Sequence, residues 1–409
     1  MAVTDRPAAD PAAMDQASVS VTAPFTAAIA EAEALINGAD FAETDAERAE
    51  GLDYLAGGIS SILQVARAGE KSHPYFVTST GPYSKMGLDN PDTLYYHATV
   101  EPDATYVVRG VRGTTADLAF QVLRGNYTAD DVPGGEVAFD DRVIPIADDG
   151  SFEITFGPER PDAAPGTHFV LGEGATMLSV REVYSDWATE VKGSITIERV
   201  DAVGVPPVEL TTARIAKRYA IAAKMLTARV NTWFNFPKWF YLGEPVNTFT
   251  EPRTTPGGLS TQYSSVGHFD LPAGKSMVVT VPQSDAPYQG FQLGSMWYIS
   301  LDYVNHQTSL NSAQAQVDPD GMIRMVIAAE DPGVANWVET THRRRGILQF
   351  RWQRTDAPIT AEQGPTAVVV DDADVPAHLP FYETNKIDAA GWAERIAVRQ
   401  RAFARRMLG

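Results

Sequence analysis

Two blocks of short alternating runs constrain the fold of this 409-residue chain more than any other feature. They span about residues 94–200 and 261–370, and in both blocks Gly, Pro and Asp separate runs of strand-forming residues such as SMVVTVPQ and GILQFRWQR. Because successive side chains of a strand point to opposite faces, such runs predict half-buried antiparallel strands. We therefore expect a mainly β protein, β-sandwich or jelly-roll-like, with helices at both termini and one central helix.

Helical periodicity appears outside these blocks. Thr44 and Glu47 form a capping box ahead of one apolar stripe, and a second stripe runs over residues 211–234. Whether the two β regions form one domain or two stays open. The expected organisation is a disordered tail at 1–23, a helical segment at 24–70, a first β region at 80–205, a central helix and aromatic segment at 211–240, a second β region at 261–370 and a C-terminal helix at 385–409.

The charge of the chain bears on its partners. With 52 Asp and Glu against 33 Lys and Arg, the formal net charge is −19. A field of that sign repels nucleic-acid phosphates and anionic lipid surfaces, so we expect no nucleic acid and no membrane partner. The chain also lacks a run of about 20 apolar residues and a basic-then-apolar leader, which predicts a cytoplasmic protein. The expected partners are a small-molecule ligand and, if the aromatic segment forms a subunit interface, further copies of the chain.

Cysteine is absent from the sequence. This excludes disulfides, thiolate nucleophiles, Cys-ligated zinc and iron–sulfur clusters. The sequence also contains no phosphate-binding Gly-rich motif, no H-E-x-x-H and no G-x-S-x-G elbow. We therefore expect neither a metal nor a cofactor, and any chemistry must use oxygen and nitrogen groups.

Two clusters of similar residues allow alternative interpretations. The aromatic run NTWFNFPKWFYLG at 231–243 either bridges two cores, lines a ligand pocket or forms a subunit interface. The last helix carries several arginines, whereas residues 1–57 are acidic. The basic helix either packs across the acidic helices or presents a solvated face.

Four segments resemble a known bacterial family: GLDNPDTLYYHATVEPDATYVVRGVRG (87–113), REVYSDW (181–187), SMWYISLDYVNHQTSLNSAQAQVDPDG (295–321) and DPGVANWVETTHRRRGILQFRW (331–352). The chain is similar, over roughly residues 80–355, to proteins built around the domain of unknown function 1214, often paired with domain of unknown function 1254. The resemblance implies a β-sandwich or jelly-roll-like architecture with helical additions. It implies no established chemistry, and the extended helical N-terminus resembles the stand-alone members.

Candidate site residues come from three polar segments, 89–96, 302–311 and 336–343, which we expect to meet at one end of a sandwich. His306 is the first candidate acid or base, oriented by Asp302 if the segment is helical. In a strand the two would lie about 13 Å apart and the pair would fail. His342, beside three arginines, is the second candidate. The expected substrate-binding residues are Asn90, Asp92, Tyr95, Trp297, Tyr298, Gln307, Asn311, Asn336 and Trp337.

These residues support three functional hypotheses. The first is an enzyme of hydrolase or lyase type that uses metal-independent acid/base chemistry on a small organic molecule in a sandwich cleft. The alternative is a non-catalytic protein that binds a sugar or another ring on its aromatic side chains. The third is a structural or oligomerisation role. A His and a carboxylate in the same pocket as the aromatic groups would favour catalysis, whereas aromatic groups alone would favour binding.

Overall fold

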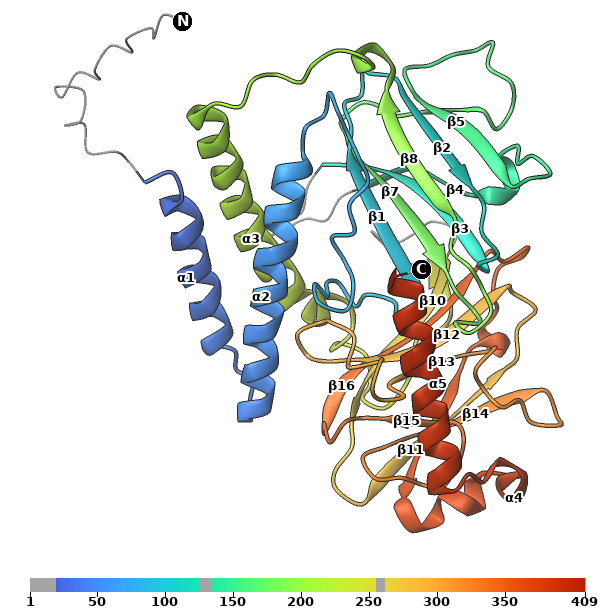
Figure 1. Ribbon diagram of the computed structural model, residues 1–409. Helices are drawn as coiled ribbons and strands as arrows, with labels where there is room; N and C mark the ends of the chain where they lie inside the picture. Colours follow the sequence, from blue (N-terminus) through green and yellow to red (C-terminus); the bar gives the residue numbers. More distant parts are fainter. Residues whose placement is uncertain (1–19, 126–133, 255–261, 409) are drawn as a thin grey trace, which may run out of the picture.

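The computed structural model describes residues 20–125, 134–254 and 262–408, so most of the expected tail lies outside it. In this part of the chain, strands β1 to β17 form four sheets. The expectation of a mainly β fold with helical additions is confirmed. The sheets pair into two sandwiches, and Figure 1 shows them one above the other, with helices beside and across them.

The first sandwich encloses a core that includes Phe120, Phe156 and Val180. Its two sheets are antiparallel apart from the short parallel pair β5–β6. One sheet has the order β1 (Thr93–Thr99), β7 (Ala175–Val183), β3 (Asp117–Arg124) and β4 (Gly134–Asp140). The other has the order β6 (His168–Val170), β5 (Ser151–Gly157), β2 (Tyr106–Val111) and β8 (Ser194–Arg199).

The second sandwich has a separate core that includes Val279, Phe291 and Trp352. Every residue of β12 is buried, because other elements cover the outer face of its sheet. One sheet has the order β13 (Ser309–Asn311), β12 (Tyr288–Gly294), β16 (Arg345–Gln353), β10 (Gln262–Asp270) and β9 (Arg253–Thr254). The other has the order β15 (Trp337–Glu339), β14 (Met322–Ala328), β11 (Lys275–Pro282) and β17 (Thr366–Asp371).

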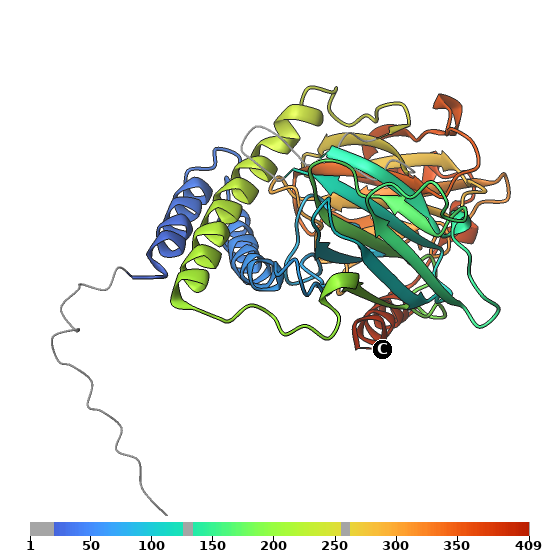
Figure 2. The same cartoon turned by 90° about the horizontal axis from the view of Figure 1, so that it is seen from above.

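Three long helices form a layer at one side of the sandwiches (Figure 2). They are α1 (Ala23–Asn37), α2 (Asp45–Ala68) and α3 (Thr212–Phe240). The predicted capping box is present at the start of α2, where Glu47 N donates to Thr44 Oγ1 at 3.2 Å and Thr44 N donates to Glu47 Oε2 at 2.9 Å. None of the described helices is both long and apolar enough to cross a bilayer.

The aromatic run forms the end of α3 and its exit. Trp233, Phe236 and Tyr241 pack with Tyr298 and with Ile347 of β16. These rings therefore bridge the helical layer and the second sandwich, as the core-bridging interpretation expects.

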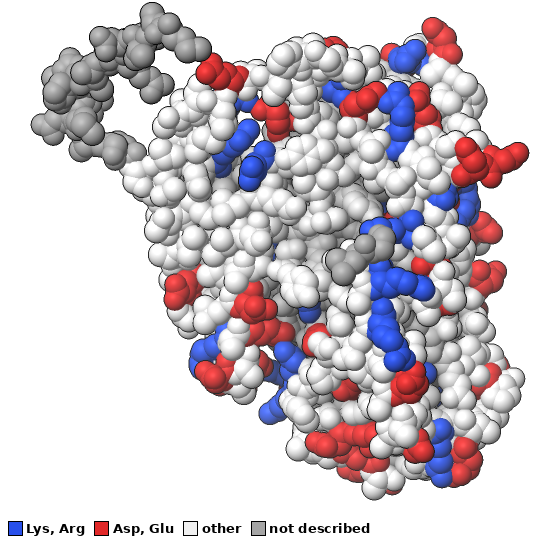
Figure 3. Space-filling view, viewed as in Figure 1, with Lys and Arg blue, Asp and Glu red and all other residues white. Residues whose placement is uncertain are grey.

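The C-terminal helices are α4 (Tyr382–Asn385) and α5 (Ala389–Leu408). Figure 1 places α5 away from α1 and α2, and Figure 3 shows basic side chains gathered along it. The acidic N-terminal segment instead pairs with arginines at the start of β16: Arg343, just before the strand, contacts Glu50 of α2 at 2.8 Å, and Arg345, its first residue, contacts Glu43, just before α2, at 2.9 Å. The arginines of α5 therefore do not neutralise the acidic residues of α1 and α2.

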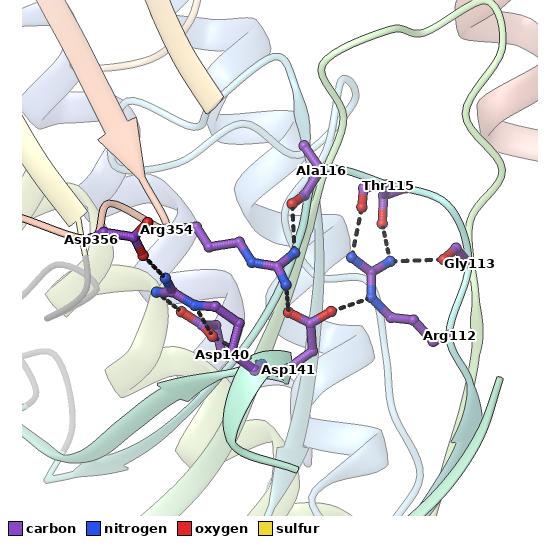
Figure 4. A network of polar contacts seen from close by, with 9 residues as sticks. Arg112, Gly113, Thr115, Ala116, Asp140, Asp141, Arg354 and Asp356 are labelled. Carbon is purple, nitrogen blue, oxygen red and sulfur yellow. Dashed lines mark hydrogen bonds and ion pairs between the residues drawn. The ribbon is translucent and has the colours of Figure 1, made fainter. Parts of the chain in front are cut away.

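An ionic network joins the two sandwiches (Figure 4). Asp141, which follows β4, pairs with Arg112 of the first sandwich at 2.6 Å and with Arg354, which follows β16, at 3.1 Å. Arg142 donates to Asp356 at 2.8 Å. Because Asp141 is 7% exposed, removing either arginine would leave a buried carboxylate poorly compensated.

Candidate functional site

The predicted residue Asp92 lies in a buried polar network between the two sandwiches. Its carboxylate accepts hydrogen bonds from Trp187 Nε1 at 2.6 Å, Tyr288 OH at 2.7 Å and Asn311 Nδ2 at 3.1 Å. Burial raises the pKa of Asp92 above its ordinary value, although the bond from Tyr288 opposes that shift. At 2% exposure, Asp92 is a structural centre of the junction rather than an open ligand contact.

Asn90 and Tyr95 belong to the same network. Asn90 N donates to Tyr95 OH at 2.9 Å, and Asn90 Oδ1 accepts from Tyr288 OH at 3.1 Å. Arg351 closes the network by donating to the carbonyl of Leu88 at 2.6 Å. Residues from all four of the segments 87–113, 181–187, 295–321 and 331–352 take part in these bonds.

His306 has a different partner from the expected one. Residues 303–305 form a turn, and Asp302 accepts from the backbone amides of Val304 at 3.0 Å and Asn305 at 3.1 Å. His306 Nδ1 lies 2.8 Å from Glu339 Oε2, and the other oxygen of Glu339 accepts from Gln307 N at 2.7 Å. The group that orients His306 is therefore Glu339 and not Asp302, because the turn directs Asp302 to its own backbone.

The loop with His342 holds its arginines in ion pairs. His342 is exposed and adopts φ 63°, in the left-handed region. Arg343 pairs with Glu50, and Arg344 pairs with Asp270 at 2.6 Å. The arginine run thus ties the loop to α2 and β10 and does not form an anion site around His342.

The remaining aromatic candidates are packed into cores. Trp297 Nε1 donates to the carbonyl of Glu47 at 2.8 Å, and the hydroxyl groups of Tyr298 and Tyr241 lie 2.8 Å apart. Trp337 Nε1 donates to the carbonyl of Ala328 at 3.1 Å. These three candidates are 2%, 4% and 8% exposed, so their rings offer no open face on which a sugar could stack.

Asn336 and Gln307 complete the predicted set. Asn336 is buried and donates to the carbonyls of Gln316 at 2.7 Å and Arg324 at 3.0 Å, which makes it structural. Gln307 lines a cleft of about 410 Å³ beneath α5, where Arg395 Nη2 donates to Gln307 Oε1 at 3.0 Å. His306 precedes Gln307 in the chain and Glu339 accepts from Gln307 N, so this pair lies next to the cleft without lining it.

A second hollow lies between α2, α3 and the outer face of the β1–β7–β3 sheet. Its volume is about 100 Å³. Its described walls are mostly apolar, formed by Ile62, Val65, Met86, Leu123, Met177 and Met225. Ser61, Ser79, His97, Thr176 and Arg229 supply its polar side chains, and Gly125 adds backbone.

Strand alternation points His97 and Met177 into this cavity. Ala98 of β1 and Leu178 of β7 face the core of the first sandwich, so their chain neighbours face outward, towards the helices. Two backbone hydrogen bonds join Val77 and His97, at 2.9 and 3.0 Å. They hold the segment before β1, which includes Ser79, against the strand.

His97 is a neutral group in the cavity wall. Its Nδ1 atom lies 3.0 Å from Ser79 Oγ. Burial lowers the pKa of His97 to about 4, and the positive charge of Arg181 acts in the same direction. At neutral pH the imidazole therefore exchanges hydrogen bonds without carrying charge.

Arg229 is the cation of the cavity, and it is 5% exposed. Its Nη1 donates to Ser61 Oγ at 2.5 Å and its Nη2 donates to the carbonyl of Lys85 at 2.6 Å. Its Nε has no acceptor among the described residues. No described carboxylate lies within 4.0 Å of its nitrogens, so only neutral groups contact this buried charge.

The part of the chain that the structure describes contains no group of three or more His, Asp or Glu side chains placed to hold a metal ion. The chemistry visible in the cavity is instead that of hydroxyls, one imidazole and one guanidinium. This donor-rich set suits a ligand with an acceptor group.

Sequence reasoning missed Ser79, His97 and Arg229, although one signal was present. Leu226, Val230 and Trp233 form the buried stripe of α3, and Arg229 lies on that stripe. A charge on an apolar helix face indicates either a buried ion pair or a ligand site. His97 gave no comparable signal, because an alternating strand contains many such positions.

Comparison with known proteins adds the fold but no activity. No protein-family model matches the chain, and no curated protein matches it significantly. The chain resembles the crystal structure of an uncharacterised protein from Burkholderia cenocepacia, with 27% identity and a TM-score of 0.77 over 86% of this chain and 97% of that one. The VPA0106 protein from Vibrio parahaemolyticus shares 13% identity with a TM-score of 0.45, over 78% of this chain and 98% of that one.

Proposed function

We propose that the protein binds a small, mostly apolar organic molecule in the cavity between α2, α3 and the first sandwich. The observation that carries this proposal is the combination of apolar walls with a few buried polar side chains, which is typical of small-molecule sites. Apolar cavities of about 150 Å³ bind benzene. The hollow of about 100 Å³ is smaller than that, so it suits a short aliphatic molecule or at most a single ring, and it is too small for a sugar.

The chemistry of His97 favours binding over catalysis in this cavity. A general base is most effective when its pKa lies near the working pH. With a pKa of about 4, His97 is a weak base at neutral pH and serves better as a neutral hydrogen-bonding group. Ser79 orients the ring for that role. This supports the non-catalytic alternative, with a hydrophobic cavity in place of stacking aromatic side chains.

A second candidate function, of hydrolase or lyase type, concerns the cleft beneath α5. The specific observation is that His306 is held by Glu339 at 2.8 Å while 46% of its side chain stays exposed. A histidine oriented by a carboxylate and open to solvent has the arrangement of a general acid or base. Trp187 and Gln307 line the adjoining cleft.

The family membership, the cytoplasmic location and a homo-oligomer are further proposals. The family proposal is supported by the meeting of its four segments in the network around Asp92. The net charge of −19 disfavours anionic membrane surfaces and nucleic acid as partners, and this supports the proposed location. The homo-oligomer is proposed from the aromatic run at 231–243, and Trp233, Phe236 and Tyr241 of that run are buried within the chain itself.

The binding proposal is tested by filling the cavity. Val65→Phe places a larger side chain into the hollow, and Val191→Phe, at a position 60% exposed, makes the same change outside it. We expect small aromatic and aliphatic molecules to raise the melting temperature of the unmodified protein and of the control Val191→Phe. They should not raise the melting temperature of Val65→Phe. Equal shifts in all three proteins would place binding elsewhere and overturn the proposal.

A further inference from the structure

We infer that the ligand of this cavity is a small organic acid with one negative charge, bound through its carboxylate by Arg229. This inference rests on the proposed function and deepens it, because it assigns the class of ligand and the residue that recognises it. The argument uses the charge of the cavity, the hydrogen-bonding capacity of Arg229 and the nature of the walls.

The charge of the cavity is positive and uncompensated among its described lining residues. Arg229 lines the cavity, and the described lining contains no Asp or Glu. The half-buried Arg112 and Arg324 pair with Asp141 and Asp318. The most buried arginines have no described carboxylate partner within 4.0 Å: Arg229, Arg351, Arg399 and Arg406. Among these four, Arg229 is the one that lines this cavity. Burying an unpaired charge is costly, and a bound anion would offset that cost.

The donors of Arg229 are not exhausted by its contacts. A guanidinium has five N–H groups. The described acceptors are Ser61 Oγ for Nη1 and the carbonyls of Lys85, at 2.6 Å, and Ser84, at 3.4 Å, for Nη2. The second N–H of Nη1 has no described acceptor, and Ser61 supplies a hydroxyl beside the guanidinium. Tyr54, whose ring centroid lies 5.4 Å from the guanidinium carbon, is a further neutral partner. A carboxylate can therefore accept from Nη1 without displacing a protein contact, and it can accept from the Ser61 hydroxyl in place of the long 3.5 Å bond from Ser61 Oγ to the carbonyl of Gly58.

The walls restrict the rest of the ligand. Met86, Met177 and Met225, together with Ile62 and Val65, make most of the described lining apolar, and that lining contains no cationic side chain besides Arg229. Methionine side chains adapt to varied apolar shapes. One cation and an apolar enclosure suit a monocarboxylate with a hydrocarbon body, whereas a phosphate or a dicarboxylate would leave charge without a partner.

The test compares each acid with its neutral amide by calorimetry at pH 7.5. The probes are pentanoate with pentanamide and benzoate with benzamide, measured on the full chain. We expect each acid to bind about tenfold or more tightly than its amide, because hydrogen bonds to a charged group are the stronger ones. Arg229→Gln should remove the preference, while Arg67→Gln, which removes an exposed charge from α2, should keep it.

The outcomes separate this inference from the proposed function. If neither acids nor amides bind, the binding proposal itself fails. If acids and amides bind equally to the unmodified protein, cavity binding stands and the inference of an acid is wrong. If the preference for acids survives in Arg229→Gln, Arg229 is not the residue that recognises the charge. Should Arg229→Gln fail to fold, Ser61→Ala, which removes the hydroxyl beside Arg229, must weaken acid binding more than amide binding; an equal effect on both would contradict the assignment.

Discussion

The hydroxyl of Ser79 lies 3.0 Å from Nδ1 of His97 in the wall of the cavity. This contact orients a ring that burial keeps neutral, and it joins the segment before β1 to the strand itself. The same histidine therefore influences both the stability of the fold and the electrostatics of the site, and both effects depend on pH.

His97 should weaken the fold in acid. Its pKa is about 4 when folded, against 6.5 for an ordinary histidine. As the pH falls from about 6.5 to 4, the unfolded chain takes up the proton first, so the free energy of unfolding decreases, by at most about 3 kcal/mol. His97→Gln should lose this part of the pH dependence. Urea unfolding of both proteins between pH 4.5 and 7.5 measures the free energy of unfolding at each pH. If this free energy depends on pH in the same way in both proteins, the pKa of His97 is not lowered by folding.

Asp117 should act in the opposite direction. It is fully buried, and burial followed by the charges of Asp140 and Asp141 raises its pKa to about 7. The unfolded carboxyl loses its proton near pH 3.8, so folding stability falls as the pH rises from about 4 to 7, by up to about 4 kcal/mol. Asp117→Asn should therefore stabilise the protein at pH 8 and much less at pH 5. Chemical denaturation at pH 5 and pH 8 tests this prediction. Asp103→Asn, at an exposed position, is the control and should leave the stability at both pH values unchanged.

Two neighbouring glycines of α2 should respond differently to alanine. A Cβ at Gly57 would lie 2.7 Å from the carbonyl oxygen of Tyr83, whereas a Cβ at Gly58 would lie 3.6 Å from Arg229 Nε. Gly57→Ala should cost about 1–3 kcal/mol because backbone must shift. Gly58→Ala should gain about 0.5–1 kcal/mol from helix propensity. Equal effects in chemical denaturation would mean that α2 does not approach residue 83 as closely as described.

The second candidate function depends on His306. Because 46% of its side chain is exposed, His306→Ala should change stability by about 1 kcal/mol or less. If the cleft beneath α5 is catalytic, the same variant should abolish hydrolysis of small esters that the unmodified protein cleaves, and Glu339→Gln should reduce it. Hydrolysis at an unchanged rate in His306→Ala would remove this histidine from the chemistry.

The sequence was informative where structure follows from local periodicity. The alternating runs and the helical stripes predicted the two β regions and the helices, because each pattern depends on neighbours a few residues apart. The capping box of Thr44 and Glu47 is similarly local. Pairing of the strands into two separate sandwiches depends on contacts between distant residues and stayed open.

The site was harder to predict, for a physical reason. Polar residues such as Asp92 and Asn311 do come together, 3.1 Å apart across 219 positions, but inside a buried network. Polarity in the sequence does not distinguish a side chain that bonds to the protein from one that faces a ligand. His97 and Arg229 meet the same cavity only because α3 packs on the outer face of the first sandwich, and periodicity carries no information about that packing.

The methyl groups of the methionines give the most direct test of ligand binding in the cavity. Met86, Met177 and Met225 line it, whereas Met277 and Met325 are buried in the core of the second sandwich. In protein labelled with ¹³C at the methionine methyls, titration with benzoate should shift the signals of the three cavity methionines together, with one dissociation constant, and leave Met277 and Met325 unchanged. Cavity signals that stay in place while benzoate binds, or no response from any methionine at millimolar benzoate, would contradict the account.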